Sequence, residues 1–284
     1  MPPRAASLIC ALALTSIAIP AAAGQWTKTY PLTGRPSIEV VAGDAAVTVT
    51  TSDRKDVEVT LTTHGWTIGD RGVSVGVETA GNQLRCRLRQ PHVSLRFGGS
   101  ESQSIELDIA IPRDADLDVR AGDGGVTVGP VNGSVRVRTS DGSIDAHGLH
   151  GETSLQTGNG SIQANGLDGG LAVITSEGRI GAEGRFERLD VRTGGGRVDI
   201  AVLEGSKLAA DWHVKSGNGA VSLHVPSDLR ASLDLTSNTG TIHVGLPLVT
   251  SGDFRRARVA GNVNGGGPVL SVHSSVGSIR IDPL

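Results

Sequence analysis

The sequence predicts an all-β protein, a single-stranded β-solenoid of about eight stacked coils with a period of 18 residues. Three observations predict it: a segment of 18 residues recurs from Leu117 onward, glycine accounts for 40 of 284 residues, and aromatic residues make up only 2%. Within each segment apolar and polar residues alternate, which is the period of a strand. A chain with so few rings needs a thin core of stacked aliphatic side chains and many tight turns.

Five units follow one another without a gap, starting at residues 117, 135, 153, 171 and 189. Three looser units start at Trp212, Leu233 and Leu270, and the longest insertion between them covers residues 249–268. Two alternating runs flank a turn such as Ser-Asp-Gly or Gly-Asn-Gly, which predicts strand, turn, strand and loop. One such unit cannot bury its apolar face alone, so we expect the units to stack at about 4.8 Å per strand.

Four positions of the unit carry one kind of residue, as expected if each side chain lies above its own copy in the next coil. The third position is aliphatic: Val119, Val137, Leu155, Val173, Val191, Val214, Leu235 and Val272. The eighth is glycine, expected to suit positive φ in the turns: Gly124, Gly142, Gly160, Gly178, Gly196, Gly219, Gly240 and Gly277. The tenth is always Val or Ile. The fifth, from Thr139 onward, is Thr or Ser, which we expect to bond the backbone or the next hydroxyl rather than to catalyse.

Two other solenoids are excluded by spacing. The left-handed helix of hexapeptide acyltransferases needs an aliphatic residue every six positions, and the unit from Val135 has Asp141 and His147 there. The calcium-binding nonapeptide pattern is absent, because no nine-residue repeat carries aspartates.

Three segments are expected along the chain. Residues 1–23 have Arg4, an apolar run broken by Pro20 and a small-residue cleavage site, which predicts a secretory signal peptide. Residues 24–116 are β-rich and less regular, and they are expected to cap the stack; IEVVAGDAAVTV within them resembles a unit with alanine in the glycine position. Residues 117–284 carry the repeats.

Charge and cysteine count limit the partners and the disulfides of the exported chain. Without residues 1–23 the net charge is −4, which argues against nucleic acid as a partner. Cys86 is then the only cysteine, so no internal disulfide can form, and it is expected to be a small buried hydrophobe. No second apolar run is long enough to span a bilayer. The expected location is the periplasm, the cell envelope or the extracellular space.

IELDIAIPRDADLDVRAGDGGVTV, the successive TSDGSI, TGNGSI and SGNGAV turns and the closing VLSVHSSVGSIRI resemble the DUF4097 family over about residues 36–282. The resemblance implies an adhesin-like β-helix in bacterial exported or envelope-associated proteins. It implies no catalytic residues for this sequence.

The sequence offers few candidates for chemistry, and we assign no catalytic, cofactor-binding or metal residues. Carboxylates lie in and after the turns, and a pair on adjacent coils would suit a glycosidase: Asp123, Asp141, Asp145, Glu177 and Asp199. Because Asn159 and Asn218 share the turn column, turn chemistry explains it equally well. His147, His150 and Asp168 would form a weak metal patch if they met, although loop polarity also explains them.

The outward fourth position of the units is largely basic, with Arg120, Arg138, Gln156, Arg192, Lys215 and His273. A regular stripe of this kind would suit an anionic polymer such as an envelope polysaccharide. Asp118, Asp190 and Asp234 lie beside it, which favours a solvated mixed face. The tryptophans and other rings form no column, which weakens a lectin-like interpretation.

We therefore predict an exported, envelope-associated, adhesin-like binding or structural module without catalytic activity, and no cofactor. Its expected partner is an envelope polysaccharide or another exported protein. The alternative is a carbohydrate-active enzyme of the parallel β-helix type, a lyase or hydrolase. Envelope-stress sensing through docking to another exported protein is a third possibility.

Overall fold

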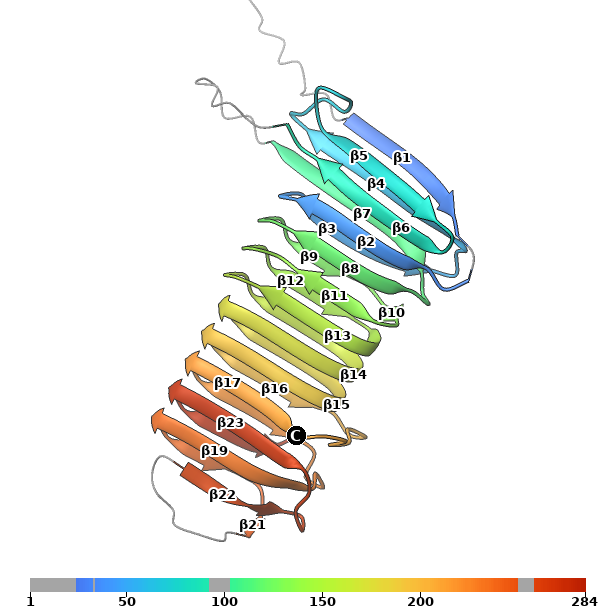
Figure 1. The fold of residues 1–284 in the computed structure, drawn as a ribbon. Coiled ribbons are helices and arrows are strands. Elements are labelled where there is room, and N and C mark those ends of the chain that lie inside the picture. The colour runs from blue at the N-terminus through green and yellow to red at the C-terminus, as the bar shows by residue number, and fades with distance from the viewer. Residues whose placement is uncertain (1–23, 33, 92–102, 250–257) are drawn as a thin grey trace, which may run out of the picture.

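The computed structural model describes residues 24–32, 34–91, 103–249 and 258–284. Within these ranges the chain forms strands, turns and bends and no helix, and all the strands belong to one hydrogen-bonded sheet. The strands lie across a long stack and follow one another along its axis (Figure 1). The all-β prediction is confirmed.

Two series of strands form the walls of the stack. The first wall contains β8 (Asp116–Ala121), β11 (Val135–Arg138), β13 (Leu149–Thr157), the C-terminal parts of β14 (Ile162–Glu177) and β15 (Ile180–Gly195), β17 (Trp212–Asn218), β23 (Val269–Val276) and β19 (Ala231–Thr239). The second wall contains β9 (Val126–Val128), β12 (Ile144–His147), the N-terminal parts of β14 and β15, β16 (Val198–Val202), β18 (Val221–Val225), β24 (Ile279–Pro283) and β20 (Ile242–Val244). A short strand, β10 (Val131–Asn132), pairs with β13 on the loop side.

The pairing register reproduces the 18-residue period. Val137 pairs in parallel with Val119 on one side and with Leu155 on the other, and Leu155 pairs with Val173. All four side chains are at most 1% exposed. Equivalent residues therefore form continuous files through the core, as predicted, and burial of these files stabilises the stack.

The eighth-position glycines are required by close stacking. A Cβ on Gly142 would lie 2.0 Å from the carbonyl oxygen of Gly124, and one on Gly160 would lie 2.2 Å from that of Gly142. Positive φ occurs in this column only at Gly178, Gly196 and Gly277, and the aspartate or asparagine that precedes a glycine of this column in the described turns does not adopt it. The expectation that Asp-Gly and Asn-Gly turns provide positive φ is therefore wrong for most units, because the turns need room for the neighbouring backbone instead.

The hydroxyl column satisfies turn carbonyls inside the stack. Thr139 Oγ1 lies 2.7 Å from the Gly142 carbonyl oxygen and 2.9 Å from Thr157 Oγ1, and it donates its one proton to either acceptor. Thr157 Oγ1 also donates to the Gly142 carbonyl at 2.9 Å. Both threonines are buried, so these bonds replace water for groups that would otherwise be unsatisfied. The structural interpretation of the column is confirmed.

The order of strands departs from the order of the sequence at the C-terminal end. The unit from Leu270 lies between the units from Trp212 and Leu233, because β23 pairs with both β17 and β19. Successive stacking of the last three units is therefore a wrong expectation. The long insertion makes this order possible: β22 (Arg258–Val263) pairs antiparallel with β19 and with β21 (Leu248–Val249), covering the outer edge before the chain returns inward.

The N-terminal part joins the same core. In β2 (Ser37–Gly43), Ile38 pairs with Leu117, and in β3 (Ala46–Ser52), Val47 pairs with Val126. Ala45 occupies the glycine position, since its carbonyl oxygen lies 2.0 Å from a Cβ built on Gly124. The segment IEVVAGDAAVTV is thus a further unit of the stack. The number of coils and the segment boundaries at residues 23 and 116 stay predictions.

Beyond that unit the chain forms antiparallel strands at the end of the stack. They are β1 (Gly24–Pro31), β4 (Asp56–His64), β5 (Ser74–Ala80), β6 (Gln83–Arg89) and β7 (Ser104–Pro112). Antiparallel pairs β1–β4 and β4–β7 extend the second wall, and β5–β6 extends the first. The capping role of residues 24–116 stays a prediction.

Candidate functional site

The predicted carboxylates lie in two separate rows: Asp123, Asp141 and Glu177 in the turn column, and Asp145 and Asp199 on the second wall. Asp141 lies in the turn column, where its Oδ1 accepts a hydrogen bond from Asn159 Nδ2 of the next unit. Asp145 lies on β12 and Asp199 on β16, separated along the second wall by β14 and β15. Asp199 is paired with Arg197 at 2.9 Å. Turn and surface chemistry therefore accounts for these groups.

The predicted histidine patch is only partly assembled. His150 and Asp168 are neighbours in register, but Asp168 forms an ion pair with Arg185. His147 lies on the second wall and pairs with Asn165 instead. Across the described ranges no three His, Cys, Asp or Glu side chains form a group that could hold a metal ion.

The basic stripe, by contrast, is one continuous surface feature. The outward fourth-position residues of the first wall lie in register, and we call them the basic file; in spatial order they are Arg87, Val41, Arg120, Arg138, Gln156, Ile174, Arg192, Lys215, His273 and Thr236. The file carries five permanent cations and no carboxylate. Sequence reasoning missed Arg87, because its strand lies outside the repeats and joins the file only through β2.

Carboxylates lie in the adjacent second-position column and neutralise part of the file. Asp118 bonds Arg120 at 2.9 Å, and Glu39 bonds Arg120 at 2.9 Å and Arg85 at 2.8 Å. The hydrogen bond from Arg85 lowers the pKa of Glu39. Asp190 bonds Arg192 at 2.8 Å. The expected mixed face is thus found where these pairs form.

Several other cations of the first wall are not neutralised by a hydrogen-bonded carboxylate among the described residues. Arg138 Nη1 lies 3.9 Å from Asp118 Oδ1, too far for a hydrogen bond. Among the ion pairs of the described residues, Lys215, Arg87 and Arg136 have no acidic partner within 4.0 Å. Arg136 is exposed on β11, two residues before Arg138. An excess of positive charge therefore remains on this wall.

The second wall carries the opposite charge. Its outward residues include Asp108, Asp145, Glu183 and Asp199, with Arg197 paired to Asp199 and Arg280 near the C-terminal end. Burial, and secondly the negative charge of Glu106, raises the pKa of Asp108. The two long walls of the stack thus differ in sign, although the net charge of the chain is small.

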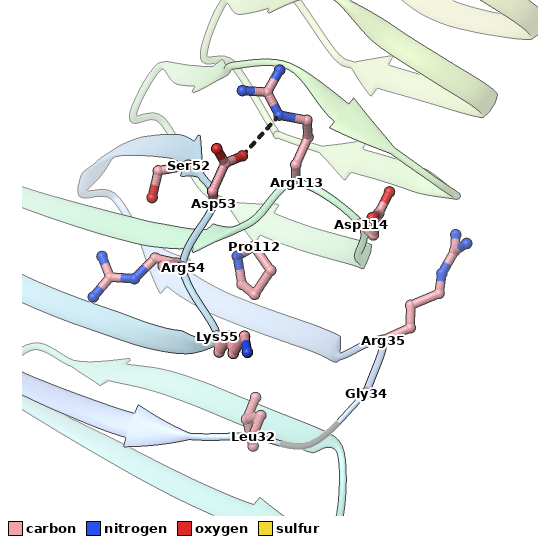
Figure 2. Close-up of a pocket in the computed structure, with 10 residues that line it drawn as sticks. All are labelled: Leu32, Gly34, Arg35, Ser52, Asp53, Arg54, Lys55, Pro112, Arg113 and Asp114. Carbon is pink, nitrogen blue, oxygen red and sulfur yellow. Dashed lines mark ion pairs between the residues drawn. The ribbon is translucent and has the colours of Figure 1, made fainter.

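A solvent-open hollow of about 750 Å³ lies on the loop side near the N-terminal end. Figure 2 shows its lining, which comes from the β1–β2, β3–β4 and β7–β8 connections: Leu32, Gly34, Arg35, Ser52, Asp53, Arg54, Lys55, Pro112, Arg113 and Asp114. Leu32 and Pro112 contribute apolar surface, and the other large side chains are charged.

Most charges of this hollow are already paired. Arg54 Nε bonds Asp56 at 2.6 Å, and Arg35 Nη2 bonds Asp116 at 2.7 Å. The bond from Arg35 lowers the pKa of Asp116. Arg113 lies 3.9 Å from Asp53, a carboxylate that is 98% exposed and therefore well solvated. The hollow can accept an anion at its rim, and its hydrogen bonds define no nucleophile and base pair.

The only cysteine outside residues 1–23 is inert in the folded state. Cys86 on β6 is fully buried and free. Burial raises the pKa of its thiol to about 12, so the reactive thiolate is scarce at neutral pH. The predicted role as a small buried hydrophobe is confirmed.

These features define an all-β repeat protein. Its outward side chains are arranged in regular files along the two long walls rather than around an enclosed cavity. The chain belongs to the Toastrack DUF4097 family, whose model matches residues 36–282. The resemblance stated from the sequence is therefore confirmed. No curated protein matches the chain.

Several solved structures are similar to this chain at low identity. A candidate adhesin from Bacteroides fragilis is 12% identical, with a TM-score of 0.41, and the match covers 93% of this chain and 99% of that one. A candidate lipid-binding protein from Parabacteroides distasonis is 13% identical, with a TM-score of 0.43 and coverage of 90% and 96%. A candidate cell adhesion protein from Clostridium sporogenes is 10% identical, with a TM-score of 0.34 and coverage of 93% and 100%.

The described part of the chain contains no helix that is long and apolar enough to cross a bilayer. The predicted signal peptide, residues 1–23, lies outside the described residues.

Proposed function

We propose that this protein is an exported, envelope-associated, adhesin-like binding module that acts without catalysis. In this proposal residues 1–23 direct export, and the two walls form a single-stranded β-solenoid of about eight coils. The solenoid is a rigid scaffold that presents polar side chains at regular intervals to a partner. The expected partner is an envelope polysaccharide or another exported protein.

One observation carries the proposal: the outward fourth-position residues of the first wall form one file in register, the basic file, with five permanent cations and no carboxylate. A file of this length favours contact with an extended partner over capture of a small molecule, because its charges are spread along the stack. The turn hydroxyls and carboxylates, in contrast, are used in hydrogen bonds between units.

The export part is tested by fractionating cells that express the full chain and sequencing the N-terminus of the recovered protein. We expect a mature chain that begins at Gly24 and lies outside the cytoplasm. Recovery of the uncleaved chain from the cytoplasm would contradict this part.

The binding part is tested by mixing purified residues 24–284 with envelope fractions from the same cells and measuring retention and polymer cleavage together. Retention at micromolar protein, with no release of new sugar ends, supports the proposal. Absence of retention would refute it. Release of unsaturated or reducing sugar ends would favour the alternative, a polysaccharide lyase or hydrolase.

A further inference from the structure

We infer that the basic file binds a linear anionic polysaccharide that lies along the stack axis; this inference rests on the proposed binding function. The relevant chemistry is a chain of sugar carboxylates or phosphates, which would contact successive cations of the first wall.

Geometry supports an extended ligand. Parallel strands are about 4.8 Å apart, so the five steps from Arg120 on β8 to Lys215 on β17 span about 24 Å. The side chains of Arg120, Arg138 and Arg192 are each about half exposed. Their charges thus point to solvent in a straight row, and a linear polyanion can follow that row.

Charge supports an anionic ligand. Glu39 and Asp118 engage Arg120, and Asp190 engages Arg192, but the file itself holds no acid. Lys215 and Arg87 have no acidic partner within 4.0 Å among the described ion pairs, and Arg138 has a distant one. Because the opposite wall is acidic, a polyanion would approach the first wall and be repelled by the second.

Surface composition favours a polysaccharide over a protein or a bilayer. The centre of a stable protein interface is usually apolar and rich in aromatic residues. In the basic file the apolar members are Ile174, which is 44% exposed, and Val41, which is partly buried. One exposed isoleucine gives too little apolar area for insertion into lipid.

The test measures binding of residues 24–284 to immobilised polygalacturonate and poly(glycerol phosphate), with neutral dextran and anionic phosphatidylglycerol vesicles as comparisons. We expect binding to at least one of the anionic polymers, weaker binding at high salt because exposed charges are screened, and no binding to dextran. The two polymers distinguish carboxylate from phosphate as the recognised group.

The Arg138→Gln/Lys215→Gln variant removes two file cations that form no hydrogen bond to an acid among the described residues. We expect it to weaken polymer binding by about tenfold or more, on the scale known for cations near an anionic surface. The Lys207→Gln/Arg230→Gln variant is the matched control: it removes one lysine and one arginine from exposed loop positions away from the file. It should bind within about twofold of the wild type, since rim charges far from a contact contribute little.

A gain of binding provides a second, independent test. Ile174 interrupts the cations between Arg138 and Arg192, so Ile174→Lys should tighten polymer binding several-fold while removing an exposed apolar group. Unchanged binding in both the Arg138→Gln/Lys215→Gln and Ile174→Lys variants would overturn the inference. Equal losses in the file variant and its matched control would overturn it too.

The remaining outcomes separate this inference from the proposed function. If the protein is retained by envelope fractions but binds neither anionic polymer, the binding function stands and the polysaccharide assignment fails. If it binds the vesicles and not the polymers, a membrane is the partner and the assignment fails. If it binds nothing, both fail.

Discussion

The glycine column makes a sharp prediction about stability at Gly160. A Cβ at this position would lie 2.2 Å from the Gly142 carbonyl oxygen, whereas real Cβ contacts below 3.0 Å are essentially never observed. Alanine would therefore force neighbouring units apart by about 0.8 Å, since the opposing atom is backbone. The φ of Gly160 is not in the left-handed region, so the effect would be steric alone.

The expected cost follows from two effects of that displacement. Overpacking in a close-packed interior costs about 1–3 kcal/mol. The Gly142 carbonyl also accepts bonds from Thr139 and Thr157, and weakening one of them costs about 1 kcal/mol. Gly160→Ala should therefore lower the free energy of unfolding by about 2–4 kcal/mol.

Urea unfolding followed by far-ultraviolet circular dichroism measures this change, and Gly125→Ala is the matched control. A Cβ on Gly125 would meet its nearest atom, the Ser143 carbonyl oxygen, at an ordinary 3.6 Å. The control should be neutral or slightly stabilising, because alanine restricts the unfolded chain. If Gly160→Ala costs less than 1 kcal/mol relative to Gly125→Ala, close stacking does not explain the column.

Three further predictions concern the core, the chain end and the thiol. Leu155→Ala should lower the free energy of unfolding by about 2–5 kcal/mol through a core cavity, and the adjacent outward Gln156→Ala should stay within about 0.5 kcal/mol; equal effects in urea unfolding would contradict the burial pattern. Deleting residues 269–284 should abolish hydrogen-exchange protection in β19 while β11 and β13 keep theirs, because β23 lies between β17 and β19; protection retained in β19 would refute the inserted order. Cys86 should react with a thiol reagent at pH 8 only after unfolding, because burial raises the pKa of its thiol to about 12 in the folded state. The stability that Cys86 contributes is therefore fully present below the unfolded pKa of about 8.5 and is lost as the pH rises toward 12. Rapid labelling of the native protein, or no added alkaline instability relative to Cys86→Ala, would argue against its burial.

The inserted last unit shows where sequence reasoning ends. The unit from Leu270 has the same aliphatic and hydroxyl pattern as those from Trp212 and Leu233, so each is compatible with either neighbour. Which pair meets depends on the path of the long insertion and on β22, which covers the edge of β19. Near-identical units can pair in parallel in any order, so the sequence does not specify which units are neighbours, and only the assembled stack decides it.

The basic file, too, could be predicted only in part from the sequence. The fourth-position cations could be found from the 18-residue period, since the period itself places Arg120, Arg138 and Arg192 in one row. Arg87 could not be found, because it joins through the pairing of β6 with β2, outside the repeat. The ion pair between Arg120 and Glu39 was also hidden, since Glu39 lies 81 residues away in sequence.

The sequence by itself determined the class of the fold, the period, the buried files and the hydroxyl column, because each is a local pattern that stacking simply repeats. The tertiary structure alone decided the order of the last units, the reason for the turn glycines and the sign of each wall. These depend on contacts between segments distant in the chain: a carbonyl from one unit occupies the space of a missing Cβ in the next, and charges on separate strands become neighbours only when those strands pair.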